Sequence, residues 1–356
     1  MAKESLCLRV PRTSGEKAIA WTRTLGIFDQ ILEILKENGS ICVPVTRKPS
    51  GDEVAALKAQ VPEFQLAMRV FQEKERREKT LAEALETRLS PHLLASLPRA
   101  LDIVGDIAIV EIPRELEPHK HAVGEAILRT HGNLRVVLAK AGAVSGTYRL
   151  RELDFLAGER RTATVHKEYG ASFYVDVAKA YFSPRLSHEH QRVASLVRKG
   201  ETVVDLFAGV GPFAVLIAKK DPDAKVYAID INAEAVELLK QNIRFNRVEN
   251  RAQAILGDAR QVVSEKLAGA ADRVIMNLPE KAGEFVDVAC NALKPAGGTV
   301  HFYGFIRLPE TLDALKQRFS EAVEEAGRKV ADFTYAKAVR ATAPYEWQAV
   351  LDAGVR

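Results

Sequence analysis

The sequence predicts an α/β protein whose C-terminal part is a doubly wound, mainly parallel sheet. Three observations support this fold class. Strand and helix patterns alternate after Ser187, a glycine-containing loop follows the first strand of that region, and the preceding block is rich in strands and turns. Alternating β and α elements bury a parallel sheet between helices, and ligands bind at the carboxyl ends of its strands.

The first 50 residues are expected to form a small α/β domain. Short apolar strands are predicted at 5–11 and 40–45, and the pattern from Lys17 to Asn38 is largely helical. Residues 51–72 are expected to be a linker, because the stretch TRKPSGDE (46–53) at its start carries Pro, Ser and Gly.

Residues 73–184 are expected to form a strand-rich α+β middle domain. Its predicted elements are strands around a turn at Gly105 (102–112), a helix (121–131), a strand (134–140) and a hairpin turning at Gly170 (165–179).

Residues 185–356 carry the alternating pattern of the doubly wound sheet. The predicted strands are 201–209, 224–232, 251–259, 271–279 and 297–306, with helices at 211–220 and 233–246 among the connections.

Composition narrows the class of protein. The chain has 356 residues, of which 47% are hydrophobic, and no apolar run of the ~18 residues that a membrane helix needs. The first residues lack an apolar signal segment, so we expect no membrane association and a cytoplasmic location. The three cysteines are scattered without metal-ligand spacing, so no metal site is predicted, and the net charge of +4 only weakly favours a polyanionic partner.

The loop DLFAGVGPFA (205–214) is the main candidate for cofactor binding. Gly209 and Gly211 permit a tight turn between a strand and a helix, and Asp230 closes the next strand, where its carboxylate can accept the ribose hydroxyls of an adenosine. This pattern alone also suits NAD.

Three further strand ends favour S-adenosylmethionine over NAD. Asp205 lies where a carboxylate meets a positively charged ligand, Asp258 suits an adenine amino group, and the amide of Asn277, beside Pro279, suits a flat base. An alternative is a vestigial fold that binds no cofactor.

Several motifs resemble one family of enzymes. The loop at 205–213, the Asn-Leu-Pro strand end and the helix with Ala235, Asn242 and Asn246 are features of class I (Rossmann-like) RNA methyltransferases. Segment 173–193, FYVDVAKAYFSPRLSHEHQRV, resembles the archaeal–eukaryal-type tRNA (guanine-37-N1)-methyltransferases most specifically. Segments 146–158 and 339–352 are similar to that family's arginine motif and closing strands.

The resemblance implies a monomer that methylates N1 of guanine 37 in tRNA. The small N-terminal domain would contact the outer corner of the tRNA, the middle domain would bind RNA near the anticodon loop, and the C-terminal domain would bind the cofactor. It also implies a cofactor site whose members are Tyr181, Arg185, Asp205, Phe207, Ala208, Gly209, Gly211, Asp230, Asp258, Asn277 and Pro279.

The chemistry of the reaction asks for three groups. Guanine N1 carries a proton, so a base must remove it, a guanidinium can stabilise the charge that moves to O6, and an amide can hold the base. By resemblance these are Glu189, Arg149 and Asn277, with Arg151 as the competitor of Arg149. The neighbouring His188 and His190 are expected to be surface residues.

Other functions remain open from the sequence. A related enzyme transfers the aminocarboxypropyl group of S-adenosylmethionine to a tricyclic guanine derivative, and some family members methylate such a derivative at the same tRNA position. A non-catalytic RNA-binding protein of the same fold is the alternative from another class.

Overall fold

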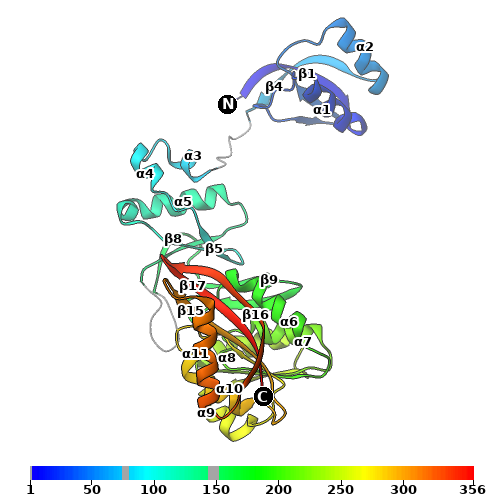
Figure 1. The fold of residues 1–356 in the computed structure, drawn as a ribbon. Coiled ribbons are helices and arrows are strands. Elements are labelled where there is room, and N and C mark those ends of the chain that lie inside the picture. The colour runs from blue at the N-terminus through cyan, green and yellow to red at the C-terminus, as the bar shows by residue number, and fades with distance from the viewer. Residues whose placement is uncertain (1, 74–79, 143–151) are drawn as a thin grey trace. The chain divides into compact units, whose positions relative to one another are not determined.

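The computed structural model describes residues 2–73, 80–142 and 152–356, which divide into two compact units, Met1–Glu78 and Lys79–Arg356 (Figure 1). Each unit is described by itself. No helix in the described ranges is long and apolar enough to cross a membrane.

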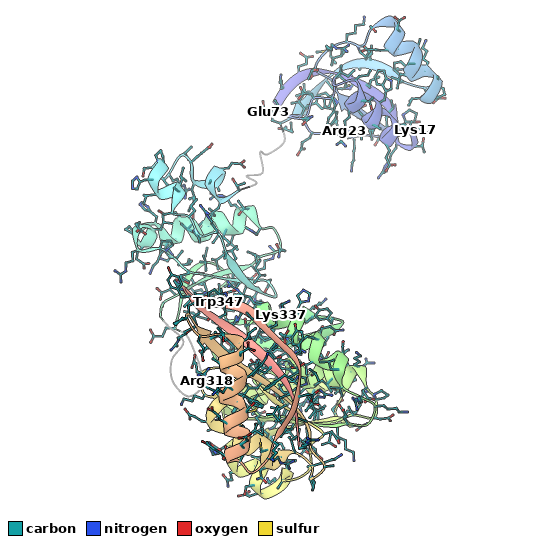
Figure 2. All side chains as sticks on the ribbon, in the orientation of Figure 1. Lys17, Arg23, Glu73, Arg318, Lys337 and Trp347 are labelled. Atoms are coloured by element: carbon teal, nitrogen blue, oxygen red, sulfur yellow. The ribbon has the colours of Figure 1, made fainter. Side chains whose placement is uncertain are left out.

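The first unit is a four-stranded antiparallel sheet with two helices. The strand order is β2-β3-β1-β4, and Leu8, Val43 and Trp21 lie in its core. Its elements are β1 (Ala2–Pro11), η1 (Arg12–Ser14), α1 (Gly15–Thr24), β2 (Leu35–Glu37), β3 (Ser40–Pro44), α2 (Gly51–Gln60) and β4 (Gln65–Gln72). Figure 2 shows Lys17 and Arg23 on α1, and both side chains are exposed.

Two expectations for this unit are wrong. The predicted helix from Lys17 to Asn38 ends at Thr24, and Asn38-Gly39 instead forms the turn between β2 and β3, with Gly39 at a φ of 72°. Asn-Gly is a strong hairpin signal, and here the glycine supplies the positive φ that the turn needs.

The expected linker at 51–72 is a helix and a strand of the first unit. The side chain of Ser50 accepts from the Glu53 amide, and Glu53 accepts from the Ser50 amide, so the two residues form a capping box at the start of α2. β4 then pairs with β1 from Gln65 to Gln72. The Ser-x-x-Glu spacing was the signal for a helix start.

The second unit begins with a four-stranded sheet of order β5-β6-β7-β8 covered by α5, as its strand-rich pattern predicts. Its elements are α3 (Leu81–Leu85), α4 (Pro91–Ala95), β5 (Leu101–Val104), β6 (Ile107–Val110), η2 (Arg114–His119), α5 (Lys120–Thr130), β7 (Val136–Lys140) and β8 (Leu153–Gly158). Gly124 lets α5 approach the sheet closely, since a Cβ there would lie 2.6 Å from Leu156 Cβ.

A hairpin of β9 (Ala163–Glu168) and β10 (Ala171–Asp176) follows, and it turns at Gly170 as predicted. Phe173 is buried in the core of the C-terminal sheet, and Asn242 bonds the backbone of Tyr174 from helix α8. The predicted domain boundary at 184/185 is therefore wrong. The hairpin precedes this boundary, but its apolar face packs against the part of the chain that follows the boundary.

The C-terminal part is the expected doubly wound sheet. Its strand order is β13-β12-β11-β14-β15-β17-β16, parallel from β13 to β15 and antiparallel at β17 and β16. Helices α6, α7 and α8 cover one face of the sheet, and α9, α10 and α11 cover the other (Figure 1). The carboxyl ends of the parallel strands therefore form an edge at which a ligand can bind.

The elements of this part are η3 (Pro184–Leu186), α6 (Ser187–Leu196), β11 (Thr202–Asp205), α7 (Pro212–Lys220), β12 (Lys225–Asp230), α8 (Ala233–Phe245), β13 (Ala252–Leu256), α9 (Ala259–Val262), η4 (Val263–Leu267), β14 (Arg273–Met276), η5 (Ala282–Phe285), α10 (Val286–Ala292), β15 (Gly298–Arg307), α11 (Leu312–Glu325), β16 (Val330–Ala343) and β17 (Glu346–Val355).

Candidate active site

The glycine loop joins β11 to α7 as the sequence predicts. Gly209 and Gly211 have φ values of 55° and 87°, and a Cβ on Gly211 would lie 2.2 Å from Leu239 Cδ1. The carboxylate of Asp230 accepts from the Gly209 amide at 2.7 Å and from the Asn232 amide at 2.9 Å. The loop and the end of β12 are thus held together by one carboxylate.

A cavity of about 300 Å³ lies at this edge of the sheet. Seven of the predicted cofactor residues line it: Tyr181, Phe207, Ala208, Gly209, Asp230, Asp258 and Asn277. Further lining residues that the sequence reasoning missed include Phe182, Ser183, Ile231, Asn232, Lys281 and Phe285. We call this space the first cavity.

Four predicted cofactor residues do not line the first cavity. Gly211 acts through its backbone as the N-cap of α7, and Asp205 is fully buried. Arg185 pairs with Asp102 of β5, and Pro279 lines a different cavity.

Asp205 is a buried carboxylate with one oxygen unsatisfied. Its Oδ1 accepts from the Phe207 amide at 3.3 Å, whereas its Oδ2 has no hydrogen-bond partner in the part of the chain that the structure describes. Burial raises the pKa of Asp205 to about 7, with a further contribution from the charge of Asp230. An unpaired carboxylate beneath the loop fits a ligand that brings positive charge, as S-adenosylmethionine does.

Asp258 and two aromatic rings complete the walls of the first cavity. Asp258 caps α9 by accepting from the Arg260 amide at 2.8 Å. Phe207 and Phe285 meet edge to face with ring centroids 5.0 Å apart. Apolar rings beside a carboxylate fit an adenine ring and its amino group.

A second cavity of about 450 Å³ shares a wall with the first. Tyr181, Phe182 and Ser183 line both, and the second cavity is also lined by Arg185 and Arg340. The shared segment is anchored by Asn232, whose Nδ2 donates to the carbonyl of Lys179 at 2.8 Å. A nucleotide in the second cavity would therefore lie next to a cofactor in the first.

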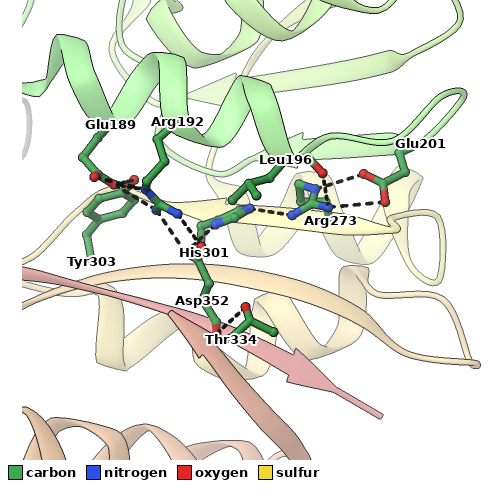
Figure 3. A network of polar contacts seen from close by, with 9 residues as sticks. All are labelled: Glu189, Arg192, Leu196, Glu201, Arg273, His301, Tyr303, Thr334 and Asp352. Atoms are coloured by element: carbon green, nitrogen blue, oxygen red, sulfur yellow. Dashed lines mark hydrogen bonds and ion pairs between the residues drawn. The ribbon is translucent and has the colours of Figure 1, made fainter. Parts of the chain in front are cut away.

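Glu189 is buried on α6 and belongs to an ion network rather than to the wall of the first cavity (Figure 3). Its Oε2 accepts from the Tyr303 hydroxyl and from Arg192 Nη2, both at 2.9 Å. Among the described residues its Oε1 accepts only from Arg192 Nε, at 3.1 Å, and this Nε also donates to Oε2 at 3.0 Å. One oxygen of Glu189 is thus less engaged than the other.

The network continues from Arg192 to Asp352, His301, Arg273 and Glu201 (Figure 3). Arg273 can only donate, so His301 accepts at Nε2 and donates from Nδ1 to Asp352 at 2.6 Å. Although burial opposes ionisation, the bonds from His301 and Arg192 lower the pKa of Asp352 to about 2. Burial also lowers the pKa of His301. We call these residues, with Glu189 and Tyr303, the buried ion network.

The two histidines differ in position. His188 is exposed, as expected. The expectation of a surface position is wrong for His190, which is 2% exposed, bonds Glu168 Oε2 at 2.8 Å and packs its ring on Phe213. It faces inward because α6 buries that side against α7.

Arg149 and its competitor Arg151 lie outside the described residues, so the structure does not choose between them. Asn277 follows β14, and its Oδ1 accepts from Gln348 Nε2 of β17 at 3.2 Å. Gln348 was missed, because no spacing in the sequence relates it to Asn277.

Comparison with known proteins gives matches over almost the whole chain. Residues 164–331 match the TRM5/TYW2 methyltransferase domain, and residues 81–162 match the TYW2 N-terminal domain. The limit between the two matches agrees with the packing of the β9–β10 hairpin onto the C-terminal sheet.

Two curated relatives and one solved structure illustrate the similarity. The tRNA (guanine(37)-N(1))-methyltransferase Trm5b of Pyrococcus abyssi is 36% identical over 348 residues, covering 98% of each chain. The tRNA 4-demethylwyosine(37)-methyltransferase Taw21 of Saccharolobus solfataricus is 33% identical over 71% of this chain and 93% of its own. A complex of aTrm5 with tRNALeu has a TM-score of 0.77 at 32% identity and covers 99% of this chain and 100% of that one.

Proposed function

The chain belongs to the TRM5/TYW2 family and is an S-adenosylmethionine-dependent tRNA (guanine-37-N1)-methyltransferase, and we propose which of its residues carry the reaction. The observation that supports the assignment best is the arrangement of the two cavities, which share the wall formed by Tyr181, Phe182 and Ser183.

The first cavity would hold S-adenosylmethionine. Asp230 would accept the ribose hydroxyls, Asp258 the adenine amino group, and the backbone of Gly209 would lie against the cofactor. The unsatisfied oxygen of Asp205 supports a role in attracting the cofactor's positive charge. When bound, the cofactor supplies the methyl group; the protein's part is to orient the base toward it.

Glu189 would be the general base. Its Oε1, which accepts a single hydrogen bond, is the atom left to take the proton from guanine N1. Tyr303 and Arg192 would hold the carboxylate in place while this happens. An arginine from the segment around Arg149 would stabilise the charge at O6.

The target base would enter through the second cavity and meet Asn277 at the edge of the first. We further propose that the enzyme acts as a monomer in the cytoplasm, that residues 80–142 and 152–158 contact the anticodon loop, and that the first unit contacts the outer corner of the tRNA. The similarity to the complex of aTrm5 with tRNALeu, which covers 99% of this chain, supports tRNA as the partner.

A second activity is favoured by one comparison. The match to the 4-demethylwyosine methyltransferase covers 93% of that relative, so methylation of a tricyclic guanine derivative is a candidate additional reaction.

The test is methyl transfer to an unmodified tRNA transcript with guanine 37, beside the same transcript with adenine 37. The cofactor is labelled separately in its methyl and aminocarboxypropyl groups. Methyl label at N1 of guanine 37 alone is the expected result. Label from the aminocarboxypropyl group in the tRNA would contradict the proposal, and tRNA carrying 4-demethylwyosine tests the second activity.

A further inference from the structure

The side chain of Asn277 is held by a chain of hydrogen bonds from the last two strands. Arg340 Nε of β16 donates to Gln348 Oε1 at 2.8 Å, and Gln348 Nε2 of β17 donates to Asn277 Oδ1 at 3.2 Å. Gln348 is 1% exposed, so water does not compete for these bonds.

The donor and the acceptor in each of these hydrogen bonds follow from the chemistry of the side chains. A guanidinium can only donate, so the atom of Gln348 that meets Arg340 must be its oxygen. The amide nitrogen of Gln348 then faces Asn277, which must present its own oxygen in return. Asn277 Nδ2 has no partner among the described residues, and Asn277 lines the first cavity.

Arg340 is itself fixed by neutral groups. Its Nη1 donates to Ser183 Oγ at 2.8 Å, and its Nη2 donates to the Tyr181 hydroxyl at 2.9 Å. No carboxylate of the described residues lies within ion-pair distance of Arg340. These two acceptors and Gln348 are all uncharged. The orientation of the guanidinium is therefore set by hydrogen bonds to β17 and to the wall that the two cavities share.

We propose that Gln348 and Arg340 are positioning residues that make Asn277 an obligate hydrogen-bond donor toward the target base. This inference rests on the proposed role of Asn277. Guanine carries the acceptor O6 beside N1, whereas adenine carries an amino donor at the corresponding position. A donor fixed in the protein would therefore accept guanine and oppose adenine, because two donors cannot satisfy each other.

The test compares two substitutions at one position. In Gln348→Glu the new carboxylate still accepts from Arg340 but also accepts from Asn277, so the Asn277 amide turns and presents its oxygen to the base. In Gln348→Met the side chain has similar volume, but Arg340 Nε loses its acceptor and Asn277 is left free to turn either way.

We expect Gln348→Glu to lower kcat for guanine-37 tRNA roughly 10-fold more than Gln348→Met, with cofactor KM unchanged in both. The preference for guanine over adenine should also narrow in Gln348→Glu. Gln348→Glu should nevertheless be the more thermally stable of the two variants, because only Gln348→Met leaves Arg340 Nε unpaired. A purely structural role predicts that activity follows stability, and that result would overturn the proposal.

Two further variants keep the test decisive. In an Asn277→Ala background, Gln348→Glu should cause no additional loss, since it acts only through Asn277; a full additional loss would contradict the proposal. If Gln348→Glu does not fold, Arg340→Gln replaces it. A glutamine at position 340 can either donate to Gln348 or accept from it, so the Gln348 amide is no longer held in one orientation. This variant should therefore lower kcat at unchanged cofactor KM. If Asn277→Ala alone keeps full activity, the role of Asn277 fails rather than its positioning.

Discussion

Asp205 and Glu189 are both buried carboxylates of the second unit, but their surroundings differ. Asp205 has one oxygen without a partner among the described residues, and burial raises its pKa to about 7. Glu189 receives hydrogen bonds on both oxygens from Arg192 and Tyr303. The first carboxylate lies beneath a cavity, and the second belongs to the buried ion network.

With the proposed roles of Asp205 and Glu189, this difference would separate cofactor binding from catalysis. A buried carboxylate without a partner is costly in the free protein, so its cost is recovered only when a ligand supplies the missing charge. A buried carboxylate with cationic and hydroxyl partners is stable in the free protein and keeps its position before any substrate arrives. We expect changes around Asp205 to alter cofactor affinity and changes around Glu189 to alter turnover.

Glu189→Gln should have the largest effect. It keeps the shape of the side chain but removes the base, so kcat should fall by about 10²–10⁴-fold while cofactor affinity is preserved. Single-turnover methyl transfer and calorimetry measure the two quantities. Glu237→Gln, on the exposed side of α8, is the matched control. Unchanged turnover in Glu189→Gln would remove Glu189 from the mechanism.

Asp230→Ala should have the next largest effect, and it should change cofactor affinity rather than turnover. It removes the proposed ribose contacts and the bond to the Gly209 amide, so cofactor affinity should fall by about 10- to 100-fold. tRNA affinity should stay the same, as measured by filter binding. Asp223→Ala, in an exposed turn before β12, is the control. An equal loss of both affinities would argue against a ribose contact.

Asp205 should make cofactor binding depend on pH. In its proposed role the ionised form would attract the cofactor's positive charge, so affinity should rise about 10-fold from about pH 6 to about pH 8, across the pKa of about 7. Asp205→Asn should flatten this dependence in calorimetric titrations. A dependence that survives Asp205→Asn would assign it to another group.

The same shift has a consequence for the stability of the cofactor-free protein. The folded-state pKa of about 7 lies above the ordinary value of 3.8, so between these values the folded state holds a proton that the unfolded state has released. This contribution to the free energy of unfolding therefore decreases as pH rises from about 4 to about 7. Denaturant unfolding of the wild type and Asp205→Asn should diverge over this range.

Tyr303→Phe should have the smallest effect. It removes one hydrogen bond to Glu189, which keeps its three bonds from Arg192, so kcat should fall by about 2- to 10-fold with cofactor affinity unchanged. Steady-state kinetics of methyl transfer measure it. A loss as large as that of Glu189→Gln would indicate that Tyr303 has a part in the chemistry of its own.

The sequence predicted the doubly wound sheet and the first cavity because their signals are local. Gly209, Gly211 and Asp230 lie at the ends of consecutive strands, and the topology of such a sheet brings strand ends together. The linker at 51–72 was mispredicted because Pro49, Ser50 and Gly51 were taken as loop residues, and this outweighed the capping-box spacing of Ser50 with Glu53.

Contacts between distant parts of the chain were not predictable in the same way. Glu189 was named as a base, but nothing near it in sequence indicates Arg192 bridging to Asp352. Likewise, Gln348 reaches Asn277 only because β17 enters the sheet antiparallel beside β15. Such contacts depend on which strands pair and in which register, and this cannot be predicted from a single sequence.

Asn232 connects the two cavities through one side chain. It follows Asp230, caps α8 and holds the carbonyl of Lys179 at the start of the wall that both cavities share. A ligand that shifts this wall would change the binding free energy of a ligand in the other cavity. Thermodynamic linkage requires each ligand to change the binding free energy of the other by the same amount. A coupling between the two cavities would therefore run through the side chain of Asn232 and the carbonyl of Lys179.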